Sequence, residues 1–141
     1  MSDYVRSRNH LTLDGARIAL AAAAKKSAEM GLAVNVAIAD TGGHLLAFER
    51  HDGAFPMSAQ VAQDKAYSVA ILGGAPTHLF YEAIKDDAAV REGIVHQHRL
   101  IAFGGGLPIM IDGEFVGTIG VSGGTAEEDR QIAEAGAAAL A

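Results

Sequence analysis

The chain of 141 residues is 50% hydrophobic and 20% charged, and it contains no cysteine. This composition suits one domain with a real hydrophobic core, and it excludes a disordered chain, a disulfide framework, a thiolate metal site and a cysteine nucleophile. The formal net charge of −6 argues against binding to nucleic acid and to anionic membranes, because both attract basic surfaces.

The N-terminal residues are polar, and no apolar stretch of signal-peptide character follows them. The longest apolar run, residues 18–24, is too short to cross a bilayer. We expect residues 1–10 to form a flexible N-terminal segment and residues 11–141 to form a single domain. We also expect the protein to be cytoplasmic, with no membrane partner.

The first half of the chain predicts a helix, a strand pair and a second helix. Residues 12–30 place apolar side chains at helical spacing between a threonine cap and a glycine stop. Residues 33–39 alternate in the manner of a strand, and a glycine turn leads into a returning strand at 44–49. A second helix is expected over residues 58–72, ending at a glycine pair.

The second half predicts an irregular helical stretch, three short strands and a last helix. The helical stretch covers residues 77–96, and the strands cover 99–103, 107–111 and 115–121. An Asp-Gly pair between the last two strands is a strong hairpin signal. The final helix begins at Thr125, where Thr-x-x-Glu forms a capping box.

The predicted order of elements is α-β-β-α-α-β-β-β-α. It lacks the alternation of strands and crossover helices that parallel sheets require, and tight turns join the strand pairs. The sequence therefore predicts a single α+β domain with a central five-stranded antiparallel sheet flanked by helices.

Lys65 is the first residue that could carry chemistry. On the predicted helix it has apolar neighbours at i−4, i−3, i+4 and i+7, so it lies on or beside an apolar face. Partial burial there would lower its pKa and free the amine to act as a base or as an anion partner. The alternative is a lysine whose stem covers the edge of the core while its ammonium reaches water.

Gly104, Gly105 and Gly106 separate two predicted strands. Glycine permits positive φ angles there and lets a ligand or another backbone approach closely. The triplet lacks the Gly-Lys-Ser/Thr of a P-loop, and no helix follows it, so it is not a nucleotide fingerprint. A bulged connection between strands would need the same residues.

Ser122, Gly123 and Gly124 lead directly into the last predicted helix. Backbone N–H groups at a helix N-terminus after flexible glycines form a natural site for a carboxylate or a phosphate. A plain strand-to-helix turn with a good cap explains the segment equally well. Asp129, one turn into the helix, is expected to support this turn rather than to take part in chemistry.

Three charged residues flank the loops of the first strand pair. Asp40 precedes a glycine turn, whose N–H groups it can accept from. Arg50 and Asp52 stand at the entrance of the next loop, where they could clamp an acidic substrate or pair with each other. We count all three as candidate ligand-binding residues.

Histidine is the usual protein ligand of haem iron, and the chain has six histidines but no His-Glu-x-x-His motif. His96 and His98 would share a face on a strand and could then share a metal, whereas on a helix they could not. His51 stands in a loop beside an aspartate. These three are the candidate metal ligands, and isolated histidines are otherwise ordinary surface or core residues.

Five segments, taken together and in order, carry a family pattern: 36–45 (VAIADTGGHL), 49–54 (ERHDGA), 64–67 (DKAY), 103–108 (FGGGLP) and 117–129 (GTIGVSGGTAEED). Over residues 11–140 the chain thereby resembles the GlcG/HbpS family, which includes the C-terminal domain of PduO-type proteins. Pro108 falls on this pattern with Asp40, Asp52, Lys65 and both glycine loops. His51 departs from it, because the family usually has methionine there.

The resemblance implies an antiparallel sheet with helices, and dimers that often assemble further, commonly to octamers. It also implies binding or degradation of haem in some members, while others are encoded beside glycolate, propanediol or aromatic catabolism genes. The iron ligand differs within the family, so the resemblance assigns none here.

Three functions follow from these observations. The favoured one is a haem-binding or small-ligand-binding protein, and the resemblance extends this function to haem degradation. The alternative is an enzyme acting on a small carboxylated metabolite, with Lys65 as base or anion partner and the glycine loops holding the substrate. The third is a non-catalytic accessory protein that forms homo-oligomers through its alanine-rich helices.

Overall fold

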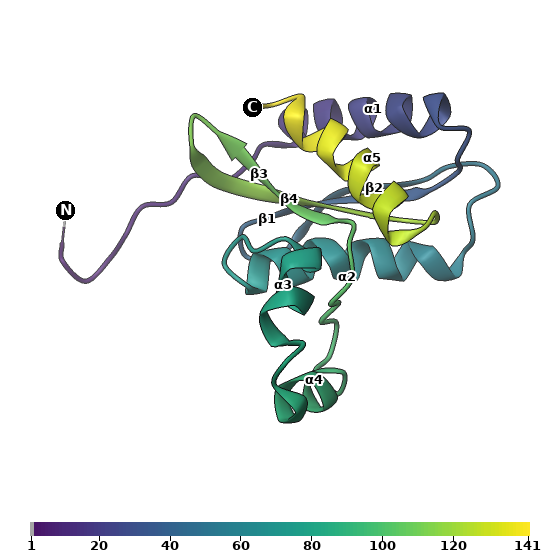
Figure 1. Cartoon of the computed structure of the whole chain (residues 1–141). Helices are drawn as coiled ribbons and strands as arrows, with labels where there is room; N and C mark the ends of the chain where they lie inside the picture. Colours follow the sequence, from purple (N-terminus) through teal and green to yellow (C-terminus); the bar gives the residue numbers. More distant parts are fainter. Residues whose placement is uncertain (1) are drawn as a thin grey trace.

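The computed structural model describes residues 2–141 and shows a sheet with helices on both faces (Figure 1). Helices α1 and α5 cover one face, and α2 covers the other. In chain order the elements are α1 (Leu13–Glu29), β1 (Asn35–Asp40), β2 (Leu45–Arg50), α2 (Met57–Ile71), α3 (Thr77–Ile84), α4 (Ala88–Ile94), β3 (Gly106–Ile111), β4 (Glu114–Ser122) and α5 (Ala126–Ala138).

The sheet has the strand order β2-β1-β4-β3, and every neighbouring pair is antiparallel. The central pair runs in unbroken register from Asn35 opposite Ser122 to Asp40 opposite Gly117. The α+β class and the antiparallel sheet predicted from the sequence are therefore confirmed. The end of β1 that carries Asp40 lies at the far end of the sheet from Ser122.

The prediction of five strands is wrong, because the sheet in the described chain has four. The missing strand is residues 99–103, which run as irregular backbone. Arg99 has a positive φ of 65°, and the Ser68 hydroxyl of α2 both donates to its carbonyl and accepts from the Ile101 N–H. A side chain thus takes the hydrogen bonds that a neighbouring strand would have used.

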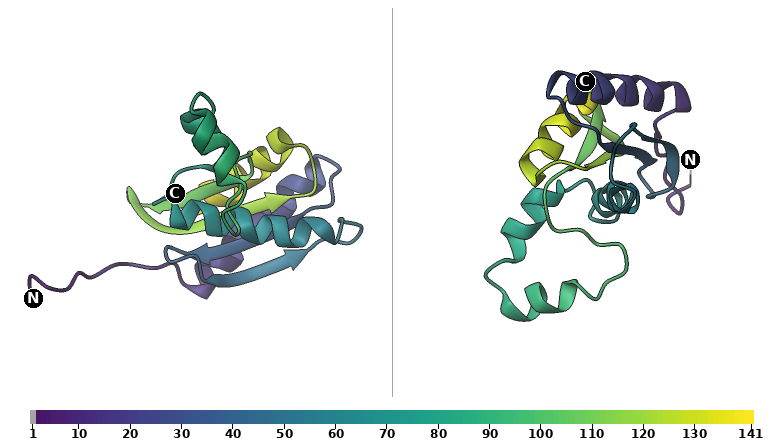
Figure 2. Two further views of the ribbon diagram at one scale, coloured as in Figure 1. Left: turned by 90° about the horizontal axis from the view of Figure 1, so that it is seen from below. Right: turned by 90° about the vertical axis from the view of Figure 1, so that its right-hand side faces the viewer.

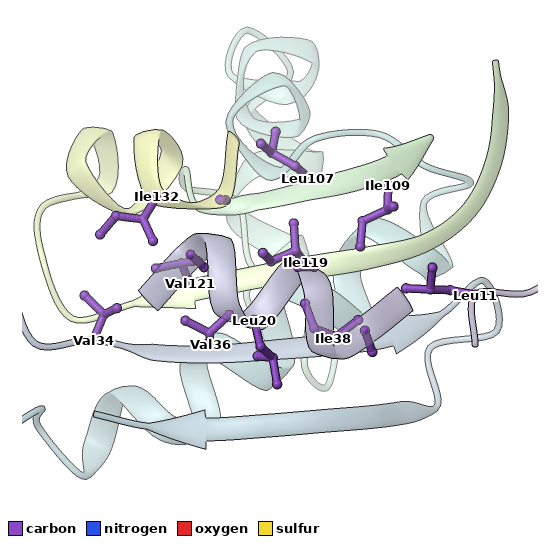
Figure 3. Close-up of a cluster of buried hydrophobic side chains, with 14 of the residues drawn as sticks. Leu11, Leu20, Val34, Val36, Ile38, Leu107, Ile109, Ile119, Val121 and Ile132 are labelled. Carbon is purple, nitrogen blue, oxygen red and sulfur yellow. The ribbon is translucent and has the colours of Figure 1, made fainter. Parts of the chain in front are cut away.

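The two faces of the sheet are packed differently. Large aliphatic side chains fill the layer under α1 and α5, including Leu20, Ile38, Ile119 and Ile132 (Figure 3). The layer under α2 is made of small residues, and Ala62 and Ala66 pack there. A Cβ built on Gly120 would lie 2.0 Å from the Ala62 carbonyl oxygen, so α2 approaches β4 at a distance that only glycine permits.

Helices α3 and α4 form an arm that stands away from the two layers (Figure 2). None of the residues of α4, all of which the structure describes, is buried. The arm is fixed where it leaves and rejoins the body: the Gly106 N–H donates to the Thr77 hydroxyl at 3.0 Å, and Arg99 pairs with Asp64 at 2.7 Å. Apolar side chains of the arm therefore face an open groove rather than the core.

Residues 2–10 are exposed and run away from the sheet in Figure 1. Leu11 is the first buried residue, and its N–H donates to the Val116 carbonyl at 2.9 Å. The flexibility expected of the N-terminal segment stays a prediction. Across the described residues, no helix is both long and apolar enough to span a membrane.

Gly120→Ala tests the close approach of α2. We expect it to lower the free energy of unfolding by about 1–3 kcal/mol or more, because the new methyl group would meet helix backbone that cannot step aside. Chemical denaturation measures the loss. Gly93→Ala is the control, since nothing lies within 4 Å of its added Cβ, and its stability should match or exceed wild type. Equal stability of the two variants would contradict the packing described here.

Candidate functional site

Lys65 lies in the middle of α2 and points through the small-residue layer toward the sheet. Its side chain is 1% exposed, and its Nζ donates to the Val121 carbonyl at 2.8 Å and to Asp129 Oδ2 at 3.1 Å. Burial removes water from the ammonium and lowers the pKa of Lys65, while the Asp129 carboxylate opposes that shift. The lysine that the sequence placed on an apolar face is thus wholly enclosed and paired.

Asp129 connects this lysine to the turn before α5. Its Oδ2 accepts from Lys65, and its Oδ1 accepts from the Gly124 N–H at 2.8 Å. The carboxylate is itself almost fully buried, at 2% exposure. The expectation that Asp129 supports the turn is therefore borne out, and its second partner is the lysine.

Two N–H groups at the start of α5, those of Gly124 and Thr125, already have acceptors within the chain. Gly124 donates to Asp129, and Thr125 donates to Glu128 Oε1 at 2.9 Å in the predicted capping box. The chain's own carboxylates thus stand where an external carboxylate or phosphate would bind. Anion binding by Ser122, Gly123 and Gly124 stays a prediction, and it would require displacing these carboxylates.

The Gly104–Gly106 segment lies directly over the ion pair. Gly105 has a φ of 127°, and a Cβ there would lie 2.5 Å from the Val121 oxygen and 2.7 Å from Lys65 Nζ. Its carbonyl accepts from the Val121 N–H at 2.9 Å. The glycine triplet was expected to allow the close approach of a ligand or of another backbone, or to form a bulged connection. At Gly105 the structure shows the close approach of another backbone, that of β4. Pro108 lies beyond it in β3, opposite Thr118.

The charged candidates of the first strand pair lie elsewhere. Asp40 Oδ1 accepts from the Gly42 and His44 N–H groups at 2.8 and 3.0 Å. Burial raises the pKa of Asp40, but these hydrogen bonds and the His44 ring more than offset it, so its pKa lies below the ordinary value. Asp40 therefore acts as a turn cap far from Lys65, and Arg50 and Asp52 are exposed.

An apolar groove lies between the arm and the 102–104 segment. It has a volume of about 500 Å³, within the range of small-molecule and cofactor pockets. Its walls are mainly apolar, and its lining residues are His78, Tyr81, Glu82, Ile84, Arg91, Ile94, Val95, Ala102, Phe103 and Gly104. Phe103 is half exposed and stacks on the Lys65 ammonium at 5.0 Å, so it separates this groove from the ion pair.

His78 is the histidine of this groove. Its Nδ1 is buried and has no hydrogen-bond partner within residues 2–141. Burial and the nearby Arg130 charge lower the pKa of His78 below its ordinary value of 6.5, so the ring is neutral at pH 7. Because Nδ1 is closed to solvent, Nε2 is the atom that could meet a ligand in the groove, and a neutral imidazole can ligate a metal through it.

The three predicted metal ligands do not meet in the described chain, where no cluster of three histidine, aspartate or glutamate side chains could hold a metal ion. His96 and His98 are exposed in the turn after α4, on neither a strand nor a helix. His51 lies on the other side of the sheet, near α1, with Ser27 and Glu49 as partners. Haem ligation by any of them stays a prediction.

Sequence reasoning missed His78 and Phe103 as site residues. His78 was one of six histidines, and no spacing or motif set it apart. What distinguishes it is an unpartnered ring beside an apolar groove, and that groove forms from segments more than twenty residues apart. Phe103 was visible only as the residue before the glycine triplet.

The fold and these loops define a small α+β domain built around an internal ion pair. The chain belongs to the HbpS-like family, since it matches the model described as "Haem degrading protein HbpS-like" over residues 11–138. This confirms the family resemblance carried by the five segments. Protein GlcG of Escherichia coli is 37% identical over 103 residues, which are 73% of this chain and 74% of that one.

Solved structures agree with this membership. The crystal structure of protein ORFY of Klebsiella pneumoniae matches with a TM-score of 0.89 and 32% identity, over 99% of this chain and 97% of that one. The structure of a PduOC–haem complex matches with a TM-score of 0.84 and 28% identity, over 93% of this chain and 95% of that one.

Lys65→Met tests the buried ion pair. It leaves the Asp129 carboxylate buried without its partner, so we expect the free energy of unfolding to fall by about 3–5 kcal/mol. The double variant Lys65→Met/Asp129→Asn should recover part of the loss. Lys85→Met removes a lysine from an exposed pair with Glu82 and should leave the melting temperature near wild type. A Lys65→Met protein as stable as Lys85→Met would contradict a structural role for the pair.

Proposed function

We propose that this protein binds haem, or a flat apolar ligand of similar size, in the groove between the arm and Phe103. The observation that carries the proposal is the neutral, unpartnered His78 on a mainly apolar groove of about 500 Å³. The haem complex of the related PduOC domain supports the choice of ligand. Haem would supply a redox-active iron, which the histidine would ligate.

The groove residues suit the chemistry of such a ligand. Phe103, Ile94 and Val95 provide apolar walls for a planar ring. Arg91 lines the same groove and offers a positive charge for a carboxylate substituent. The groove thus offers one base for iron, one cation for an anionic substituent and apolar surface for the ring, beside the carboxylate of Glu82.

The enzyme alternative is not favoured by the geometry. Lys65 would have to leave both Val121 and Asp129 before its amine could act as a base, and its side chain is 1% exposed. In the loops proposed to hold a substrate, the Gly124 N–H already donates to Asp129 and the Gly105 carbonyl already accepts from Val121. A catalytic role for Lys65 therefore finds no support in its contacts.

Self-association belongs to the proposal. The arm and the start of α2 expose apolar side chains, among them Phe55, Met57, Leu79 and Val95, that a second copy could cover. The haem content is therefore to be expressed per subunit, with the mass of the assembly measured by native mass spectrometry. A dimer, or an octamer assembled from four dimers, is the assembly that the family resemblance leads us to expect.

A haemin titration followed by absorbance tests the ligand and the histidine together. We expect wild-type protein to give a saturable Soret shift, which His78→Ala weakens about tenfold or more because the axial ligand is lost. His51→Ala and His96→Ala/His98→Ala should bind as wild type. His10→Ala belongs in the panel, because His10 lines a separate cavity of about 370 Å³. A shift lost in any variant except His78→Ala would refute the assignment of the groove, and an unsaturable shift would refute specific haem binding.

The pH dependence of the titration follows from the lowered pKa of His78. Only the neutral ring can ligate iron, so protonation competes with binding. An ordinary histidine would lose half of its neutral form at pH 6.5, whereas His78 keeps it to a lower pH. We expect haemin affinity to fall to half of its value at pH 8 only at a pH below 6.5. Affinity that already halves near pH 6.5 would show that an unperturbed histidine is the ligand.

A further inference from the structure

Three side chains on the α1 side of the sheet form a chain of hydrogen bonds that the proposed haem groove does not use. Ser27 Oγ lies 3.4 Å from His51 Nδ1, and His51 Nε2 lies 2.9 Å from Glu49 Oε1. Ser27 comes from the last part of α1, Glu49 from β2, and His51 from the loop that follows. Fold and topology bring them together across more than twenty residues of sequence.

The chemistry of these partners sets the direction of the hydrogen bonds. A glutamate carboxylate only accepts, so a ring with a single proton carries it on Nε2 and donates it to Glu49. The Nδ1 lone pair then faces the Ser27 hydroxyl. Ser27 Oγ also donates to the Ala24 carbonyl at 2.9 Å, so the hydroxyl must turn from this acceptor to the ring before His51 can take its proton. The serine thus has a base within hydrogen-bond distance, and a carboxylate orients that base.

Ser27 and His51 line one small cavity. Its volume is about 220 Å³, and apart from Ser27, His51 and Asp52 its walls are aliphatic, from Ala24, Ala28, Leu32 and Ala33. The Ser27 side chain is buried at 1% exposure, whereas the His51 side chain is 20% exposed at the mouth. A cavity of this size accommodates a short acyl group.

We propose that Ser27, His51 and Glu49 form a second site, a nucleophilic serine that is acylated by small esters and hydrolyses them. Nucleophile, base and orienting carboxylate in this arrangement are the signature of acyl transfer on many folds. The ring is used in reverse, with Nδ1 toward the serine and Nε2 toward the acid. This proposal does not rest on haem binding.

The reaction balances without any cofactor. The Ser27 O–H bond breaks, His51 Nδ1 takes the proton, and Oγ forms a bond to the acyl carbon of the ester. Collapse of the tetrahedral adduct expels the alcohol, which leaves with the proton from His51. Water then adds to the acyl-serine, again losing a proton to His51, and the carboxylic acid departs as Ser27 recovers its hydrogen.

The proposed site depends on His51, the residue by which this chain departs from the family pattern. The resemblance places methionine at this position in most of the family, and methionine can neither accept the serine proton nor donate to Glu49. Glu49 and Ser27 would then have no connection. His51→Met is therefore a substitution that the fold is expected to accept and that removes only the base.

Reaction of wild-type protein with p-nitrophenyl acetate tests the nucleophile directly. We expect p-nitrophenolate release and, after acid quench during turnover, an acetyl group that peptide mass spectrometry maps to Ser27. Ser27→Ala and His51→Met should lose about 100-fold or more of the rate, and Glu49→Gln a smaller part. Acetylation confined to lysine or histidine side chains, with no acetyl-Ser27, would overturn the proposal.

His44→Ala is the matched control. His44 pairs with Asp40 at 3.2 Å and is 82% exposed, so it reproduces the histidine–carboxylate pair without a serine. Its removal should leave turnover unchanged. A Ser27→Ala variant that melts at the wild-type temperature yet keeps the wild-type rate would assign the activity to imidazole alone and overturn the serine assignment.

Discussion

The buried Lys65–Asp129 pair is the constraint on which this side of the molecule depends. Its members come from α2 and α5, and the Lys65 ammonium also donates to the Val121 carbonyl near the end of β4. Removing two charges from water costs several kcal/mol per ion, so such a pair adds little net stability over an apolar core. The pair instead fixes the relative positions of α2, α5 and β4, because a shift of these elements would leave a buried charged group without a partner.

The small-residue layer is what allows the pair to form. Because Gly120 has no side chain, α2 lies close to β4. At this distance Lys65 Nζ reaches both the Val121 carbonyl and the Asp129 carboxylate. Gly105 likewise has no Cβ, and this leaves room for the Lys65 ammonium beside it. The two glycine loops therefore make their observed contacts with the ion pair and its neighbours. A ligand that bound the same backbone groups would have to displace these contacts.

Sequence periodicity predicted most of this fold but not all of it. The strands at 35–40, 45–50 and 114–122 were visible because alternation and turn residues agree there. Residues 99–103 have the same apolar character, and only Ser68, some thirty residues earlier, decides that they do not pair. Lys65 was detectable from its apolar helix face, whereas His78 and Ser27 acquire partners or a cavity only through contacts distant in sequence.

The two proposed sites are physically separate. The arm that forms the proposed haem groove contacts the rest of the domain mainly at its two ends. A ligand in the groove therefore need not disturb the core of large side chains under α1 and α5. The Ser27 cluster lies at the junction of α1 with β2 and its loop, on the side of the sheet that α1 covers. Phe103 stacks on Lys65 and also lines the groove, so a ligand in the groove would touch a direct neighbour of the ion pair. The groove and the Ser27 cavity share no lining residue, so a ligand in one does not touch the side chains that line the other.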